Sequence, residues 1–349
     1  MRGLRKIKPY TPGEQPKRKR MIKINTNENA YLPSPKVLAA LKAFDGNDLR
    51  LYSSLTNDTL ISALAENLKV PASKITTGNG SDDVLALAFQ SFFNTDDPII
   101  FPDLTYGFYS VWCDLFRIPY QEVPLNQAFE FDFAAIPEKV GGIVLANPNA
   151  PTGIFKSLSE IERLLEKYSD VVVIVDEAYI AFGGKSAVPL LEKYDNLYIT
   201  RTFSKDAALA GLRVGYGLGN EKLTSVIQAV KNAYNPYAVD LIAEALATAA
   251  VKDVAYYQQI NQEIANVRDW FIDELAALGF STLASQTNFV LTTHQNASAQ
   301  ELFEGLKAKD IYVRFFPNQE RLRDFLRISI GKKEEMQEVL RVLQEILTR

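Results

Sequence analysis

The sequence has few of the residues on which many enzymes depend. Its 349 residues include one cysteine, Cys113, and one histidine, His294. A single cysteine cannot form a disulfide within the chain, and a single histidine excludes metal sites built from several histidines. Any Ser-His or Cys-His nucleophilic pair would depend on that one histidine. We therefore expect no metal and a reducing compartment, the cytoplasm.

Long apolar runs are also missing. No stretch approaches the roughly 20 apolar residues of a membrane-spanning helix, and no apolar segment follows the basic N-terminus as it would in a secretory signal. The net charge of −4 argues against nucleic acid or an anionic membrane as the main partner. Hydrophobic residues make up 47% of the chain and charged residues 23%, which is typical of a globular protein. We expect small molecules as substrates.

Strands and helices alternate through the first two thirds of the chain. Seven short runs predict strands, at 74–77, 98–101, 120–123, 142–146, 171–175, 197–200 and 213–218. Helical patterns lie between most of them, including one from about Ser159, which has capping-box spacing with Glu162. This repeat predicts an α/β fold with a mostly parallel seven-stranded sheet and helices on both faces.

The pattern changes after about residue 235. Residues 240–278 are nearly all helical in pattern, and shorter strands and helices follow, ending in an amphipathic C-terminal helix. We predict three parts. Residues 1–32 form an N-terminal arm that packs on the small domain and the active site, residues 33–240 a large cofactor-binding domain, and residues 241–349 a smaller α/β domain.

Two stretches carry the residues that indicate chemistry. In VVVIVDEAY, residues 171–179, an apolar strand ends at Asp176, and open α/β sheets bind ligands at the carboxyl ends of their strands. A buried carboxylate is costly to ionise unless it is paired, and a protonated pyridine nitrogen is such a partner. In RTFSKDAALAGLR, residues 201–213, Lys205 has small neighbours; a partly desolvated lysine can form a Schiff base with a carbonyl. Arg213 can bind phosphate with its fork of donors.

Each of these features has a plainer interpretation. Asp176 could cap a helix, and Lys205 could be a surface lysine. The turn GNGSD, residues 78–82, could hold a phosphate at a helix N-terminus or could be an ordinary strand-to-helix junction. It is neither GxGxxG nor a Walker loop, which argues against a dinucleotide or a nucleoside triphosphate.

In chain order, the motifs resemble those of the fold-type I pyridoxal-phosphate aminotransferases, and within them the histidinol-phosphate aminotransferase family. The matching segments are GNGSDD, TYGFY, NPNAPTG, VDEAY, RTFSKDAALAGLR, TNFV, VR and LRISIG. The resemblance implies a homodimeric enzyme of histidine biosynthesis that transfers an amino group between L-histidinol phosphate and 2-oxoglutarate, giving glutamate. An aromatic amino-acid aminotransferase is the alternative. A third alternative is a non-catalytic regulator of this fold, which would often carry an attached DNA-binding domain. The matched region fills the chain, so we do not favour this alternative.

The resemblance also implies roles for individual residues. Lys205 would carry the cofactor pyridoxal 5'-phosphate as a Schiff base and then move the reacting proton. Asp176 would hold the ring nitrogen and Tyr179 the ring oxygen. The remaining cofactor-binding residues would be Gly80, Ser81, Asp82, Tyr106, Asn149, Thr202, Ser204 and Arg213. Tyr52 would reach across the dimer to the neighbouring cofactor phosphate.

Four further residues would bind the substrates in this resemblance. Arg327 would face a carboxylate or the phosphate of the larger substrate, and Arg314 would help with that phosphate. Asn27 and Tyr31, from the N-terminal loop, would close the pocket.

The sequence departs from the family pattern at two places. The family has an asparagine directly before Pro-Thr-Gly, where Ala150 stands here. Either Asn147 or Asn149 replaces it, or Tyr179 meets the ring oxygen alone. In the second place, the family's Tyr-Pro is Tyr52-Ser53, which keeps the tyrosine but changes the loop.

Overall fold

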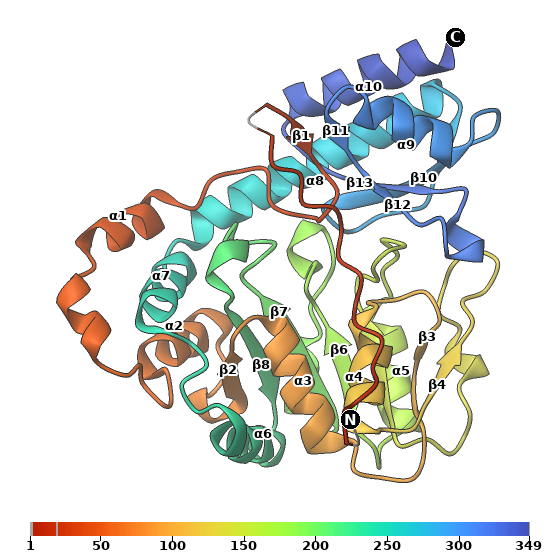
Figure 1. Ribbon diagram of the computed structural model, residues 1–349. Helices are drawn as coiled ribbons and strands as arrows, with labels where there is room; N and C mark the ends of the chain where they lie inside the picture. The colour runs from red at the N-terminus through yellow and green to blue at the C-terminus, as the bar shows by residue number, and fades with distance from the viewer. Residues whose placement is uncertain (1–2, 19, 349) are drawn as a thin grey trace.

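The computed structural model describes residues 3–18 and 20–348, and a seven-stranded sheet forms the centre of its larger part (Figure 1). The strand order is β2-β8-β7-β6-β5-β3-β4. The strands are β2 (Ile75–Gly78), β3 (Ile99–Pro102), β4 (Tyr120–Val123), β5 (Gly142–Ala146), β6 (Val173–Asp176), β7 (Leu197–Thr202) and β8 (Gly215–Gly219). Only β8 runs antiparallel to its neighbours, β2 and β7. The prediction of a mostly parallel sheet of seven strands is confirmed.

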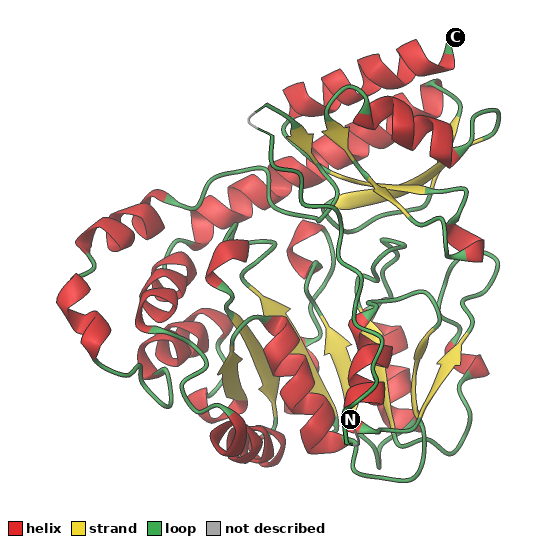
Figure 2. Cartoon of the chain, in the orientation of Figure 1, coloured by secondary structure: helices red, strands yellow, loops and turns green. Residues whose placement is uncertain are grey.

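Helices cover both faces of this sheet, as Figure 2 shows. On one face lie α3 (Ser81–Phe92), α4 (Phe108–Phe116) and α6 (Glu221–Tyr234), which share a core with Val144 and Ile174. On the other face lie α2 (Asp58–Leu68), α5 (Leu158–Lys167) and α7 (Leu241–Val251), which share a core with Ile143 and Val173. Successive strand residues therefore face different helix layers, and every residue of β5 and β6 is buried. Burial on both faces explains the continuous apolar runs in the sequence.

A smaller antiparallel sheet has the order β12-β13-β10-β9. Its strands are β9 (Phe280–Thr282), β10 (Phe289–His294), β12 (Arg314–Phe315) and β13 (Leu326–Ser329). It packs with α8 (Val254–Ala277), α9 (Ala299–Lys307) and α10 (Lys333–Leu347) around a second core. Beside it, β1 (Ile22–Lys23) pairs in parallel with β11 (Ile311–Tyr312), so the N-terminal segment joins the small sheet's side of the molecule.

The helical stretch after residue 240 divides into two helices with different partners. The break falls at Lys252–Asp253, and α7 packs on α1 (Pro35–Ala43) and α2, whereas α8 continues to the small sheet. In the part of the chain that is described, no helix is both long and apolar enough to cross a bilayer.

The N-terminus of α5 corrects one sequence prediction. The capping box is formed by Ser157 and Glu160: Ser157 Oγ accepts from Glu160 N–H, and Glu160 Oε2 accepts from Ser157 N–H at 2.8 Å. The predicted Ser159–Glu162 box is wrong, because Ser159 lies inside the helix and Glu162 bonds Lys193 instead. The same spacing occurs twice, and only Ser157 has the extended backbone of a cap.

The two serines make a matched test of this cap. Ser157→Ala removes the cap acceptor, so we expect it to lower the free energy of unfolding by about 1 kcal/mol. Ser159→Ala should change it by less than about 0.5 kcal/mol. Urea unfolding of both variants measures the difference. Equal losses, or a larger loss for Ser159→Ala, would contradict the assignment.

Candidate active site

The predicted catalytic residues lie where two central strands of the large sheet end. Asp176 is the last residue of β6, and Lys205 follows the end of β7 by three residues. A short N-terminal segment, residues 25–29, passes between these strand ends and the small sheet. Its carbonyls at Asn25 and Thr26 accept hydrogen bonds from Arg327 and Lys205. The site is therefore built from both sheets and the segment between them.

Asp176 is held in one orientation by three donors. Its carboxylate accepts from Tyr109 OH at 3.0 Å, Thr200 Oγ1 at 3.1 Å and Ala178 N–H at 3.2 Å. Only 4% of the residue is exposed. Burial raises the pKa of Asp176 to about 6, although the three hydrogen bonds act in the opposite direction. A carboxylate in this position gains from a cationic partner that a ligand supplies.

Lys205 presents an amine that is easily deprotonated. Its Nζ donates to Thr26 O at 3.0 Å and lies 6.0 Å from the centre of the Tyr179 ring. Desolvation lowers the pKa of Lys205 to about 8, and the positive charges of Arg327 and Arg213 add to the effect. A larger fraction of the amine is thus neutral near pH 7 than in an exposed lysine, as a Schiff-base nucleophile requires.

Tyr179 and Asn27, predicted for the cofactor and the substrate, are in contact. Asn27 Nδ2 donates to Tyr179 OH at 2.9 Å. Asn27 has a left-handed backbone, with φ of 57°, and Ser329 Oγ bonds both its N–H and its Oδ1. The tyrosine ring packs edge-on against Phe289, with centroids 5.2 Å apart. Both side chains are therefore fixed from the small-sheet side.

The predicted phosphate-binding residues meet at the start of α3. Gly80 has φ of 84°, and a Cβ there would lie 2.6 Å from Arg213 Nη2, so the turn needs glycine. Helix α3 begins at Ser81, and the N–H groups of its first turn suit an anion. Arg213 Nη1 reaches Ser204 Oγ at 3.4 Å, and Ser204 N–H donates to Thr202 Oγ1 at 3.1 Å. Polar groups from the start of α3, the end of β7 and the loop before β8 thus lie together at the position where a phosphate could bind.

Asp82 holds two of these residues. Its carboxylate accepts from Arg213 Nη2 at 2.7 Å and from Tyr106 OH at 2.7 Å. Desolvation raises the pKa of Tyr106, and the charge of Asp82 adds to this. The Asp82 side chain therefore positions Arg213 and Tyr106, while its backbone N–H lies in the helix N-terminus.

The two asparagines that were alternatives at the ring oxygen are both engaged in the loop. Asn149 Nδ2 donates to Leu104 O and Thr152 Oγ1, each at 3.0 Å, and its Oδ1 accepts from Thr105. Both ends of the Asn147 amide bond the backbone of Lys156. This arrangement favours the alternative in which Tyr179 meets the ring oxygen alone. Cofactor binding by Asn149 stays a prediction.

Two arginines face the site from the small sheet. Arg314 and Arg327 are directly paired across β12 and β13, so their side chains leave the same face. Both guanidinium groups lie over the Phe316 ring, at 5.4 and 5.8 Å from its centre. Arg327 Nε is buried and has no hydrogen-bond partner among the described residues. Desolvation lowers the pKa of Arg327, and an anionic ligand would offset that cost.

The sequence analysis missed Tyr10. Its ring stacks on Phe108 with centroids 4.2 Å apart and lies 6.2 Å from the Tyr106 ring. The adjacent carbonyls of Thr11 and Pro12 accept hydrogen bonds from Arg314. The one available signal was that Tyr10 is the only aromatic residue before residue 31 in a stretch rich in lysine, arginine and proline.

Two predicted residues, Tyr52 and Tyr31, have side chains with other contacts in the described part of the chain. Tyr52 is 82% exposed and stacks on Tyr237, with centroids 4.7 Å apart. Tyr31 is partly buried, and Lys332 Nζ lies 5.7 Å from its ring centre. In residues 3–18 and 20–348, no hydrogen bond links either tyrosine side chain to Lys205 or Asp176. Their predicted roles stay predictions.

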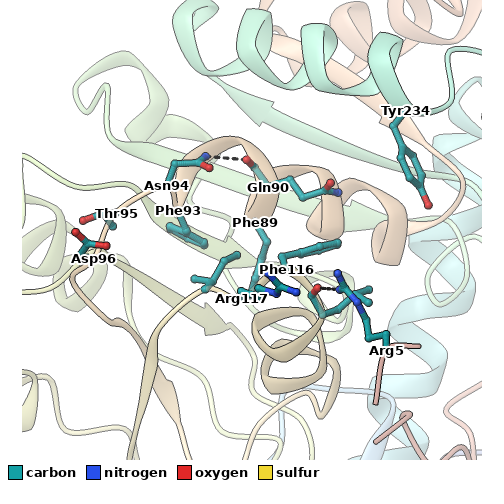
Figure 3. A pocket seen from close by; sticks show the side chains of 12 residues that line it. Arg5, Phe89, Gln90, Phe93, Asn94, Thr95, Asp96, Phe116, Arg117 and Tyr234 are labelled. Carbon is teal, nitrogen blue, oxygen red and sulfur yellow. Dashed lines mark hydrogen bonds between the residues drawn. The ribbon is translucent and has the colours of Figure 1, made fainter. Parts of the chain in front are cut away.

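A hollow of about 980 Å³ lies elsewhere on the large sheet's part of the molecule (Figure 3). It is lined by the end of α3, the end of α4, Arg5 and Tyr234. Residues 93–96 and Ile118 of its wall precede β3 and β4, so it lies toward the amino ends of these strands. None of the predicted site residues lines it, and parallel sheets bind their ligands at the opposite ends.

The residues at the strand ends fit a phosphorylated pyridine aldehyde. A buried carboxylate suits a ring nitrogen, a lysine of lowered pKa suits an aldehyde, and the glycine turn with Arg213 suits a phosphate. Gly80 is buried, and the absence of a Cβ lets the Arg213 guanidinium pack against its backbone, beside the N–H groups at the start of α3 that would bind such a phosphate.

Two curated proteins and two solved structures show what the chain is similar to. Histidinol-phosphate aminotransferases of Lactococcus lactis subsp. cremoris and Clostridium beijerinckii are 44% and 43% identical over 345 residues, which is 99% of this chain and 97% and 96% of theirs. The structure of the Sinorhizobium meliloti enzyme in complex with pyridoxal-5'-phosphate superimposes with a TM-score of 0.83 at 26% identity, covering 94% of this chain and 91% of that one.

A second structure, the histidinol-phosphate aminotransferase of Clostridium acetobutylicum, gives a TM-score of 0.85 at 26% identity and covers 94% of this chain and 99% of that one. A family model described as aminotransferase class I and II matches residues 19–343. The resemblance predicted from the ordered motifs is confirmed. The match spans both sheets and every strand that positions the site, and the chain belongs to the class I and II aminotransferases.

Proposed function

We propose that this protein is a histidinol-phosphate aminotransferase that binds pyridoxal 5'-phosphate. It would transfer an amino group between L-histidinol phosphate and 2-oxoglutarate, with imidazole-acetol phosphate and glutamate as the other pair, in histidine biosynthesis. One observation carries the proposal. Lys205, Asp176 and Arg213 meet in a site that fits the cofactor, and two arginines face that site from the small sheet. Relatives of this name match nearly the whole chain.

Each residue near the strand ends would have a distinct task. When bound, pyridoxal phosphate supplies a ring that withdraws electrons from an attached amine. The Asp176 carboxylate would keep a proton on the ring nitrogen, because the three donors hold its oxygens in place. Tyr179 OH would donate to the ring oxygen, and Tyr106 would pack on the ring. Gly80, Ser81, Asp82, Thr202, Ser204 and Arg213 would hold the phosphate.

Lys205 would move the proton of the reaction. Its Nζ lies between Thr26 O and the Tyr179 ring, and with a pKa of about 8 it can both accept and return a proton near neutral pH. Because the amino group remains in the site between two half-reactions, the two substrates would use the same pocket in turn.

The two arginines would select anionic substrates. Arg327 has a buried N–H that finds no partner in residues 3–18 and 20–348, and its guanidinium suits the carboxylates of 2-oxoglutarate and glutamate, or the phosphate of the larger substrate. Arg314, paired beside it, would add a second charge for that phosphate. Asn27 would close the pocket through Tyr179, and we keep Tyr31 as a candidate on the same loop.

An aromatic amino-acid aminotransferase is the second candidate. The stacked rings of Tyr10 and Phe108, with the tilted ring of Tyr106 beside them, suit a planar side chain, and they would accept a phenyl ring as well as an imidazole. The charge of the substrate's far end decides between the two, because only the phosphate ester needs Arg314.

We further propose a homodimer in the cytoplasm, with Tyr52 reaching the partner's cofactor phosphate. Exposed apolar side chains precede and follow Tyr52 in the sequence, on α1 and between residues 46 and 55: Leu38, Leu41, Leu49, Leu51 and Leu55. Such a cluster favours a protein interface. For the domains, we propose the arm over residues 1–32, the large domain over residues 33–240 and the small domain over residues 241–349.

A substrate panel tests the function. We expect kcat/KM for L-histidinol phosphate to exceed that for phenylalanine and tyrosine by at least about 100-fold, because a phosphate bound by two arginines is worth about 3 kcal/mol. Arg314→Gln should reduce the value for the phosphate ester and leave that for phenylalanine nearly unchanged. Lys205→Ala should abolish all turnover. A phosphate ester without advantage would favour the aromatic alternative.

The lowered pKa of Lys205 can be measured on the cofactor-free protein. A small amine-reactive reagent should label Lys205 with a pH midpoint near 8, whereas an exposed lysine ordinarily titrates near 10.4. Arg327→Gln removes a neighbouring positive charge, so the midpoint should rise. Peptide mass spectrometry follows each lysine separately. A Lys205 midpoint above 10 in the parent protein would contradict the assignment.

Subunit mixing tests whether Tyr52 acts across a dimer. We expect Lys205→Ala to be inactive and Tyr52→Ala to bind the cofactor weakly. In a mixed dimer, one site would combine an intact Lys205 with an intact Tyr52 from the other subunit. Mixing the two variants should therefore raise activity above the sum of the separate proteins. Activity equal to that sum, with mixed dimers demonstrated by mass, would show that Tyr52 does not act in trans.

A further inference from the structure

Strands β6 and β7 carry polar pairs on both of their faces. Asp176 and Thr200 are directly paired in the register, and Thr200 Oγ1 donates to the Asp176 carboxylate on one face. The next residues along the chain, Glu177 and Arg201, point to the other face because successive side chains alternate. The proposed function uses the first pair and leaves the second without a role.

Glu177 and Arg201 form a buried ion pair in which two N–H groups of the arginine converge on one carboxylate oxygen. Arg201 Nε and Nη2 donate to the same Glu177 oxygen, Oε2, at 3.0 and 2.9 Å. Ser186 Oγ donates to Oε2 at 2.8 Å, and Ala187 N–H donates to Oε1 at 2.6 Å. The exposed fraction of the Glu177 side chain is 1% and that of Arg201 is 15%.

Arg201 also faces the other ionisable groups on this side of the sheet. Its Nη1 lies 3.5 Å from Tyr216 OH on β8. Burial raises the pKa of Asp206 to about 6, and the charge of Arg201 opposes that rise. Asp206 directly follows Lys205, and Glu177 directly follows Asp176. The ion pair and its neighbours are therefore adjacent in sequence to both Asp176 and Lys205 of the proposed site.

The Glu177–Arg201 pair lies just after the last paired residues of β6 and β7, where the backbone hydrogen bonds between the two strands end. The register of β6 with β7 ends at Asp176 and Thr200, and Glu177 N–H donates to Thr200 O at 2.8 Å. Beyond this backbone bond, residues 201–209 and residues 177–187 are linked by the Arg201 side chain, which supplies the hydrogen bonds between them among the described residues. After it, one segment continues to Tyr179 and the other to Lys205.

We propose that Glu177 and Arg201 are a positioning pair that sets the placement of Asp176 relative to Lys205. Neither residue faces the proposed cofactor, so both act through their chain neighbours. A buried ion pair adds little net stability over an apolar pair of similar volume, because desolvation offsets the attraction. Its fixed geometry, with two arginine donors on one carboxylate oxygen and Ala187 N–H on the other, does constrain the distance and angle between the two strand ends. The inference rests on the proposed cofactor site.

Two variants of the ion pair, compared with a control, distinguish an effect on the placement of Asp176 and Lys205 from a general loss of protein stability. Glu177→Gln keeps the shape and most hydrogen bonds but removes the charge, so it should fold. The double variant Glu177→Leu/Arg201→Met replaces the pair by apolar side chains and leaves no unpaired buried charge. Tyr198→Phe, on the same strand, is the matched control, because it removes a buried hydrogen bond of 2.6 Å to Thr76 that lies away from the site.

We expect both pair variants to weaken binding of pyridoxal 5'-phosphate by about tenfold or more, a loss of about 1.4 kcal/mol. In the loaded protein, the pH midpoint of the visible absorbance should move upward by at least about 0.5 unit. The reason is that a less firmly held Asp176 stabilises less positive charge on the ring, and less positive charge nearby favours the protonated form of the Lys205 nitrogen. Tyr198→Phe should lower the melting temperature and leave both cofactor readouts unchanged.

A folded Glu177→Gln or double variant with the parent's cofactor affinity and pH midpoint would overturn the proposal. Equal changes of cofactor affinity and pH midpoint in Tyr198→Phe would overturn it as well, since a general loss of stability would then explain them. The proposed function fails in a different way: the parent protein itself would bind no pyridoxal 5'-phosphate.

Discussion

The burial of one carboxylate is the constraint on which the site depends. Asp176 ends a strand whose residues are all buried, and three donors hold its oxygens. Its raised pKa shows that the protein alone does not fully compensate the charge. A ligand with a cationic ring nitrogen would complete the compensation.

The protonation of Lys205, on the other side of the site from Asp176, depends on contacts between the two sheets. Lys205 follows the large sheet, yet the charge of Arg327, on the small sheet, helps to lower its pKa. The N-terminal segment mediates this arrangement, because Asn25 O accepts from Arg327 and Thr26 O accepts from Lys205. Moving the small sheet away would therefore change the protonation of the amine as well as the shape of the pocket.

Sequence reasoning succeeded where a pattern is local. Buried strands gave continuous apolar runs, and the residue types after them suggested Asp176 and Lys205 before any contact was known. It failed where a local pattern occurs twice, as with Ser157 and Ser159, because the spacing does not reveal which serine has the extended backbone. It also gave no weight to Tyr10, whose partner Phe108 lies almost 100 residues further along the chain.

The sequence by itself determined the α/β class, the order of the strands along the chain and the residue types at the strand ends, because alternation and burial depend on near neighbours. Only the tertiary structure decided that Asn147 and Asn149 are bonded within their loop and that Glu177 meets Arg201. It also decided that Arg327 keeps a buried N–H with no partner in the described part of the chain. Those facts depend on side chains that approach from different strands, loops and sheets, and their distances follow from packing and not from spacing.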